Sequence, residues 1–116
     1  MQSHFRVEAR SQGQAKILAV GGELDLAAAT SLEEELDRAL ESGSPCIVID
    51  LEQLEFIDST GLSVLVRGHQ RAQESGLELG LIHAGAQVER LLSLTGLAQR
   101  LTLPQERQEE LFQTGG

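Results

Sequence analysis

A short polar step separates two apolar segments near the middle of the chain, and it holds the residues best suited to chemistry. Asp58, Ser59, Thr60 and Gly61 follow a strand-like segment and precede a helix-like one. Ser59 is therefore predicted to lie where a helix begins, near unpaired backbone N–H groups and the positive end of the helix dipole. A hydroxyl there can cap the helix or carry a phosphate. From these residues alone capping is the simpler interpretation, because Ser and Asp are common N-caps.

Three carboxylates, on Asp25, Asp50 and Asp58, each follow an apolar, strand-like segment. In a mostly parallel sheet the carboxyl ends of the strands meet at one edge, so we expect these side chains to gather there. One of them could be the phosphoacceptor of a magnesium-dependent site. Such a site needs a cation to balance the phosphoryl charge, however, and the single lysine, Lys16, belongs to a predicted hairpin. We therefore favour roles in capping turns and helix starts, which Asp fills readily.

Hydrolase and metal chemistry are both disfavoured by the neighbouring residues. A nucleophilic serine needs a base and an oxyanion hole, and the Gly-x-Ser-x-Gly turn of many serine hydrolases does not surround Ser59. His69 falls on the apolar stripe of the following helix, about 15 Å from its start, while His4 is near the N-terminus and His83 ends a strand. These histidines and Cys46 lack the short paired spacings of zinc sites. We predict no catalytic residue, no metal and no cofactor.

Composition indicates one domain with its own core. The 116 residues are 41% hydrophobic, and we assign all of 1–116 to a single domain. A net charge of -9 and the lack of a basic patch disfavour direct binding to nucleic acid or to an anionic membrane. The first residues carry no apolar signal segment, and no stretch approaches the roughly 20 apolar residues of a membrane span. With Cys46 the lone cysteine, this predicts a cytoplasmic protein.

The hydropathy pattern alternates between strand and helix signals. Strands are predicted at 5–9, 15–20, 46–51, 77–81 and 101–103, the first two as a hairpin, and helices at 28–41, 59–76 and 88–95. Thr30 and Glu33 form a possible capping box for the first helix, and Gly96 is expected to end the third in a left-handed conformation. The core spans about 4–103, and 104–116 should form a loosely docked helix or a tail. This order predicts an α/β fold with a mixed central sheet of four to five strands and three to four helices.

Four segments in this order resemble the STAS domains of anti-sigma factor antagonists, and the likeness spans nearly the whole chain. They are Gly22-Glu23-Leu24-Asp25-Leu26, Ile47-Val48-Ile49-Asp50-Leu51, Phe56-Ile57-Asp58-Ser59-Thr60-Gly61-Leu62 and Leu91-Leu92-Ser93-Leu94-Thr95-Gly96-Leu97. The resemblance implies a STAS-like fold. It also implies that Ser59 is phosphorylated by a partner anti-sigma factor that is itself a serine kinase, with Thr60 as the second candidate acceptor. Ser59 is then better interpreted as a regulated phosphosite than as a cap.

The same resemblance implies a partner-switching mechanism without catalysis. The unphosphorylated protein would sequester the anti-sigma factor and free a sigma factor for RNA polymerase, as in a stress response, and a serine phosphatase would reset the phosphorylated form. The partner-binding residues that it implies are Asp25, Asp58, Ser59, Thr60, Gly61 and Leu62. A phosphate would add about -1.5 to -2 charges beside Asp58 and repel an acidic or apolar partner surface. ATP belongs to the kinase, and we expect a monomer.

Two other functions stay open at this point. A STAS domain can also be an accessory subunit of a transporter or of a lipid-handling complex, where the same fold would act as a structural adaptor. The third possibility is an enzyme that uses Ser59 as a nucleophile, which the absence of a hydrolase turn disfavours.

Overall fold

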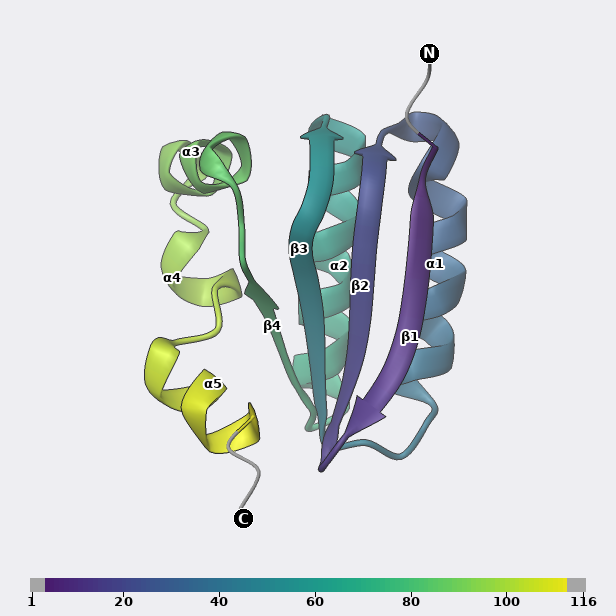
Figure 1. Ribbon diagram of the computed structural model, residues 1–116, viewed down its shortest axis with the longest axis vertical. Coiled ribbons are helices and arrows are strands. Elements are labelled where there is room, and N and C mark those ends of the chain that lie inside the picture. Colours follow the sequence, from purple (N-terminus) through teal and green to yellow (C-terminus); the bar gives the residue numbers. More distant parts are fainter. Residues whose placement is uncertain (1–3, 113–116) are drawn as a thin grey trace.

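The computed structural model describes residues 4–112 as a four-stranded sheet with five helices (Figure 1). The strands are β1 (Arg6–Gln12), β2 (Ala15–Leu24), β3 (Cys46–Ile57) and β4 (Glu78–Ile82). The helices are α1 (Leu26–Leu40), α2 (Ser59–Glu74), α3 (Ala86–Thr95), α4 (Ala98–Leu101) and α5 (Gln105–Phe112). Within the described residues, no helix combines the length and the apolar character needed to cross a membrane. The predicted mixed α/β class is confirmed.

The strand order places two helix starts at one edge of the sheet. The order is β1-β2-β3-β4, with β1 antiparallel to β2 and with β2, β3 and β4 parallel. Leu24, the last residue of β2, pairs with Ile57, the last residue of β3, so these two strands end level with each other. Since α1 follows β2 and α2 follows β3 within two residues, both helices begin at the carboxyl edge of the sheet (Figure 1).

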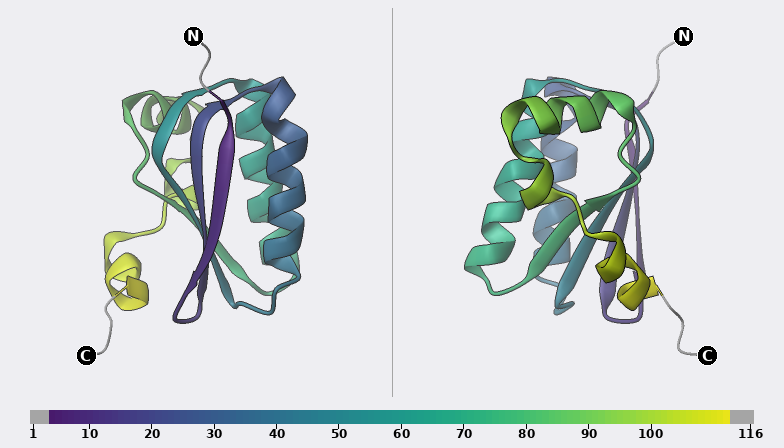
Figure 2. Two further views of the ribbon diagram at one scale, coloured as in Figure 1. Left: turned by 45° about the vertical axis from the view of Figure 1, so that its right-hand side comes forward. Right: turned by 90° about the vertical axis from the view of Figure 1, so that its left-hand side faces the viewer.

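Helices α1 and α2 lie side by side over one face of the sheet (Figures 1 and 2). Each has an apolar stripe at helical spacing, and these stripes pack on alternate strand residues. The largest fully buried side chains of this core include Leu18, Leu24, Leu32, Leu36, Ile47, Ile49, Ile57 and Leu65. The core therefore fixes both helices on the sheet along their whole length, and with them the positions of their first turns.

The opposite face of the sheet carries a smaller apolar cluster that α5 covers in part (Figure 2). Leu111 and Phe112 of α5 pack on this cluster and stay half-buried. Arg107 joins α5 to the sheet, because its Nη2 and Nε donate to the Glu78 carboxylate at 2.7 and 2.9 Å. Burial, with a further contribution from Glu78, raises the pKa of the Cys46 thiol in this cluster to about 12. The predicted burial of Cys46 is confirmed, and of the segment expected as a helix or a tail, Gln105–Phe112 forms α5.

The predicted strands differ from the observed ones in several places. β1 and β2 continue to Gln12 and Leu24, past the predicted ends at residues 9 and 20. Strand β3 continues from Cys46 to Ile57, well past the predicted end at residue 51. Most of its second half is exposed, so polar residues interrupt the apolar run while the backbone still pairs with β2. The predicted strand at 101–103 is wrong, because Leu101 ends α4 and only Thr102 forms a bridge, to Leu81.

The first helix begins earlier than the capping-box pattern predicts. Asp25 is extended, with φ -123° and ψ -170°, and its Oδ1 accepts a hydrogen bond of 3.1 Å from the Ala28 N–H. Asp25 is therefore the N-cap of α1, and Thr30 lies inside the helix rather than at its start. The strand end at Leu24 leaves Asp25 as the first residue free to turn, and that decides where α1 begins. Gly96 does end α3 with a left-handed φ of 75°, as predicted.

Candidate functional site

Ser59 is the first residue of α2, and Asp58 caps that helix in its place. Asp58 is extended, with φ -107° and ψ -177°, and its Oδ1 accepts a hydrogen bond of 2.9 Å from the Gly61 N–H. The interpretation of Ser59 as a possible cap is therefore wrong. Ser59 is exposed, and its hydroxyl forms no hydrogen bond with any residue of 4–112. Folding of the helix start leaves this oxygen free for another molecule.

The two capping aspartates are held together by the strand ends. Besides the Leu24–Ile57 pairing, the Asp58 N–H donates to the Leu24 carbonyl oxygen at 3.2 Å. Asp25 follows Leu24 directly, so the caps of α1 and α2 are adjacent across two neighbouring strands. Both aspartates are half-buried, and Ser59, which follows Asp58 directly, is exposed.

The expected cluster of three carboxylates holds only two, because Asp50 lies elsewhere. Asp50 pairs with Ala19 and with Ile82, seven residues before the end of β3, which is about 23 Å at the rise of an extended strand. Its Oδ1 is 3.0 Å from Nδ1 of His83, whose backbone has a φ of 57°. The apolar run ends at Leu51 but the strand does not, so Asp50, which was expected at the carboxyl edge, lies in the middle of β3.

Gly61 lets α2 begin directly against β2. A Cβ atom added to Gly61 would lie 2.5 Å from the Leu24 carbonyl oxygen and 2.7 Å from Leu24 Cγ, far closer than atoms approach without strain. Gly61 is buried, and what it contributes is this close contact. That role was not predicted from the sequence, although a glycine in the first turn of a helix can indicate the close approach of another segment. Of the next two positions in the motif, Thr60 and Leu62 are both half-buried.

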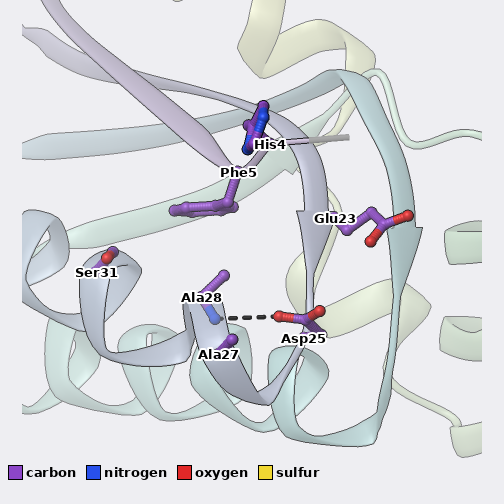
Figure 3. Close-up of a pocket in the computed structure, with 7 residues that line it drawn as sticks. All are labelled: His4, Phe5, Glu23, Asp25, Ala27, Ala28 and Ser31. Atoms are coloured by element: carbon purple, nitrogen blue, oxygen red, sulfur yellow. Dashed lines mark hydrogen bonds between the residues drawn. The ribbon is translucent and has the colours of Figure 1, made fainter. Parts of the chain in front are cut away.

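A cavity of about 350 Å3 opens on the α1 side of the site (Figure 3). It is lined by His4, Phe5, Glu23, Asp25, Ala27, Ala28 and Ser31. Figure 3 shows the capping bond from Asp25 to the Ala28 N–H at the floor of this cavity. The cavity is therefore lined by the start of α1, with the carboxylates of Glu23 and Asp25 and with His4.

In the described part of the chain, no histidine is hydrogen-bonded to Ser59 as the base of a serine hydrolase would be. His69 lies ten residues along α2, about 15 Å from Ser59 along the axis, and is buried against the core. Burial, aided by the nearby Arg100 charge, lowers the pKa of His69. Among residues 4–112, no three His, Cys, Asp or Glu side chains are placed to hold a metal ion. Ser59 thus has its hydroxyl at a helix start, and no basic side chain of residues 4–112 is hydrogen-bonded to it.

Comparison with known proteins identifies the family. The model of the STAS domain family matches residues 6–112, which is nearly all of the chain. This chain belongs to the STAS domain family. Among its relatives, the anti-sigma-F factor antagonist RsfB of Mycobacterium tuberculosis is 32% identical over 87 residues, which are 75% of this chain and 70% of that protein.

Solved structures share the fold of this STAS domain. An anti-sigma factor antagonist from Mycobacterium paratuberculosis has a TM-score of 0.82 at 22% identity, covering 96% of this chain and 98% of that one. The Bacillus cell fate determinant SpoIIAA in its phosphorylated form has a TM-score of 0.68 at 18% identity, covering 92% and 97%. At these identities the likeness is one of fold, so the roles of individual residues in this STAS domain depend on its own geometry.

Proposed function

We propose that this STAS domain is an anti-sigma factor antagonist that binds its anti-sigma factor when Ser59 is unmodified and releases it when Ser59 is phosphorylated. One observation carries the proposal: Asp58 caps α2, which leaves the Ser59 hydroxyl exposed and unbonded at the helix start. The identity to an anti-sigma-F factor antagonist supports the choice of partner. The phosphorylated form of a fold neighbour supports the chemistry.

The modification is a phosphoryl transfer that the partner carries out. The anti-sigma factor, acting as a kinase, would transfer the γ-phosphoryl group of ATP to Ser59 Oγ. A bond forms between Ser59 Oγ and the γ-phosphorus, the bond from that phosphorus to the bridging oxygen breaks to release ADP, and a base of the kinase takes the hydroxyl proton. A serine phosphatase would hydrolyse the phosphoserine and restore the binding form. The STAS domain itself supplies only the acceptor and the docking surface, so it needs no catalytic residue or cofactor of its own.

Electrostatics explains why one phosphate would be tolerated by the fold but not by the partner. The phosphate would sit at the positive end of the α2 dipole, where negative charge is stabilised by about 0.3–1 kcal/mol. It would also add about -1.5 to -2 charges beside Asp25 and Asp58 on a chain of net charge -9. A partner surface shaped to meet a neutral hydroxyl would then face a bulky dianion. Such an antagonist acts in the cytoplasm, where sigma factors meet RNA polymerase.

We assign the residues around Ser59 three roles: contact with the partner, a second candidate acceptor, and positioning of α2. Asp25 and Asp58 present carboxylates to the partner, and Leu62 presents its half-buried side chain one turn along α2. Thr60 is the second candidate acceptor, but it is less exposed than Ser59. Gly61 is buried, so we assign its share in binding to the position that it gives α2 rather than to contact with the partner.

Phosphosite mapping tests the acceptor. Purified protein is incubated with Mg-ATP and each anti-sigma factor kinase of the source genome, and intact mass and peptide maps are recorded. We expect one phosphoryl group, located on Ser59, and none on Ser59→Ala. Ser75→Ala is the matched control, because Ser75 is another exposed serine but lies at the opposite end of α2, so it should leave labelling unchanged. Labelling that persists in Ser59→Ala and maps to Thr60 would contradict the assignment. A separate affinity purification with this protein as bait tests the adaptor role, which recovery of a membrane permease instead of an anti-sigma factor would favour.

A further inference from the structure

A cavity of about 350 Å3 lies between α2, β4 and α4, away from the start of α2. His69 and Gln73 of α2 line it, together with Gln99 and Arg100 of α4. His69 lies ten residues after Ser59, which is about 15 Å along the helix axis. We call this feature the His69 cavity. The proposed phosphorylation of Ser59 gives it no role.

His69 is a buried polar side chain that has no hydrogen-bond partner among residues 4–112. The residue is 8% exposed, and the histidine ring that is hydrogen-bonded in this part of the chain is that of His83. No fully enclosed side-chain nitrogen or oxygen of the described residues lacks a partner. The ring nitrogens of His69 therefore reach solvent, at the cavity that this residue lines. A buried imidazole in this position can offer its N–H group to a molecule bound in the cavity.

Arg100 brings a positive charge to the same cavity. It is exposed and forms no ion pair within residues 4–112, whereas Arg67, Arg71 and Arg107 each pair with a carboxylate. The guanidinium is close enough to act on His69, because burial first and then the Arg100 charge lower the pKa of that imidazole. The ring is therefore neutral near neutral pH, with one N–H donor and one acceptor nitrogen.

The carboxylate that lines the cavity is already engaged by a cation. Glu78 of β4 accepts hydrogen bonds from Nη2 and Nε of Arg107 at 2.7 and 2.9 Å. Much of the remaining lining is aliphatic, since Leu77, Leu79 and Leu103 contribute to it. The cavity thus combines a guanidinium that no described carboxylate pairs with, a neutral imidazole and apolar walls.

We propose that the His69 cavity binds a small organic acid, whose carboxylate or phosphate group is held by Arg100 and His69 and whose apolar body lies against the leucines. Arginine suits either group, because its planar guanidinium donates two parallel N–H bonds to an oxyanion. The imidazole N–H supplies a further directed donor, and the aliphatic walls favour burial of a carbon chain. This site is independent of the function proposed for Ser59, since it requires neither a protein partner nor a phosphorylated serine.

Binding of an anion should change the titration of His69, which a purely structural histidine would not show. Negative charge beside the imidazole opposes the effect of Arg100 and so raises the pKa of His69. The other ionised group that lines the cavity is Glu78, whose pKa its hydrogen bonds to Arg107 lower, so it stays charged across the range in which His69 titrates. A rise in the His69 pKa on addition of a ligand therefore reports the ligand itself.

Nuclear magnetic resonance tests the proposal with three probes: butyrate, butyl phosphate and inorganic phosphate. Each is titrated to millimolar concentration into the unmodified protein, and backbone amide shifts and the His69 ring protons are followed. Arg100→Gln removes the charge and His69→Leu removes the donor, with urea unfolding to verify that both variants are folded. Arg90→Gln is the matched control, because Arg90 is also exposed and forms no ion pair in the described part of the chain, but belongs to α3 and does not line the cavity.

We expect butyrate or butyl phosphate to shift the amides of α2 and α4 around the cavity and to raise the pKa of His69. Arg100→Gln should bind that ligand at least about tenfold more weakly, the loss expected when a charge-assisted hydrogen bond is removed, and Arg90→Gln should bind it normally. Which of the two organic acids binds more tightly identifies the head group. Inorganic phosphate binding as tightly as butyl phosphate would overturn the organic ligand. Absence of shifts around the cavity with every probe, or undiminished binding by Arg100→Gln, would overturn the site.

Discussion

Gly61→Ala tests whether the start of α2 needs direct contact with β2. The added Cβ would lie 2.5 Å from the Leu24 carbonyl oxygen. That oxygen cannot move freely, because it accepts the Asp58 N–H at 3.2 Å. Overpacking of this kind costs about 1–3 kcal/mol, and the fixed backbone obstacle places it near the upper end. Alanine recovers up to about 1 kcal/mol of helix propensity, which leaves a net loss of about 2 kcal/mol.

Gly68→Ala is the matched control for this prediction. Gly68 lies in the same helix, but its added Cβ would meet the tip of a flexible side chain, Leu36 Cδ1, at 3.1 Å. That methyl group can shift, so the propensity gain should offset the contact and leave stability within about 1 kcal/mol of wild type. Urea unfolding followed by circular dichroism gives both free energies, and Gly61→Ala should also melt about 8 °C lower. A Gly61→Ala protein as stable as wild type, or an equal loss in Gly68→Ala, would refute the reasoning.

Three further predictions concern the cap and the reverse face of the sheet. Asp58→Ala should lose about 1 kcal/mol in thermal unfolding and Asp58→Asn should retain most of it, because Asn can still accept the Gly61 N–H; equal losses would contradict the capping role. The Arg107 hydrogen bonds lower the pKa of Glu78, so the stability they add is present above its ordinary value of 4.5 and lost as pH falls through the lowered pKa. Acid titration should therefore destabilise wild type more than Arg107→Gln below about pH 4.5, and parallel curves would argue against the pair. Cys46, with a pKa raised to about 12 mainly by burial, should resist iodoacetamide at mildly alkaline pH until urea unfolds the protein, and rapid native alkylation would show that the cluster under α5 opens.

Local patterns in the sequence predicted those parts of the fold that depend on near neighbours. The apolar run from Cys46, the helical stripe through Leu65 and the glycine at 96 each act through periodicity or backbone conformation, and each has the predicted role. The start of α2 after Asp58 was predicted for the same reason, since polar capping residues separate the strand from the helix.

Features that depend on contacts between distant segments could not be predicted in this way. The close approach of Gly61 to Leu24 joins residues 37 positions apart, and nothing near Gly61 in the sequence indicates its neighbour. Pairing with β2 extends β3 through polar residues that would not form a strand by pattern alone. The sequence offers both Asp25 and Thr30 as possible N-caps of α1. Asp25 is the N-cap because β2 ends at Leu24, and the end of β2 depends on its pairing with β3.

The Ser59 hydroxyl has no hydrogen bond within residues 4–112 because Asp58, and not Ser59, is the N-cap of α2. Sequence alone offered Asp58 and Ser59 as alternative caps for one helix, and only the geometry assigns the cap to Asp58. Because the cap is already filled, phosphorylation of Ser59 removes no hydrogen bond on which the fold depends. We therefore expect the phosphorylated protein to be folded and about as stable as the unmodified one.

The most direct measurement is calorimetric titration of one anti-sigma factor with this STAS domain before and after stoichiometric phosphorylation of Ser59. We predict that phosphorylation weakens binding by more than about a hundredfold, equivalent to about 3 kcal/mol, while the circular dichroism spectrum stays the same. Equal affinities of the two forms would contradict the central claim that charge on Ser59 decides whether the partner docks.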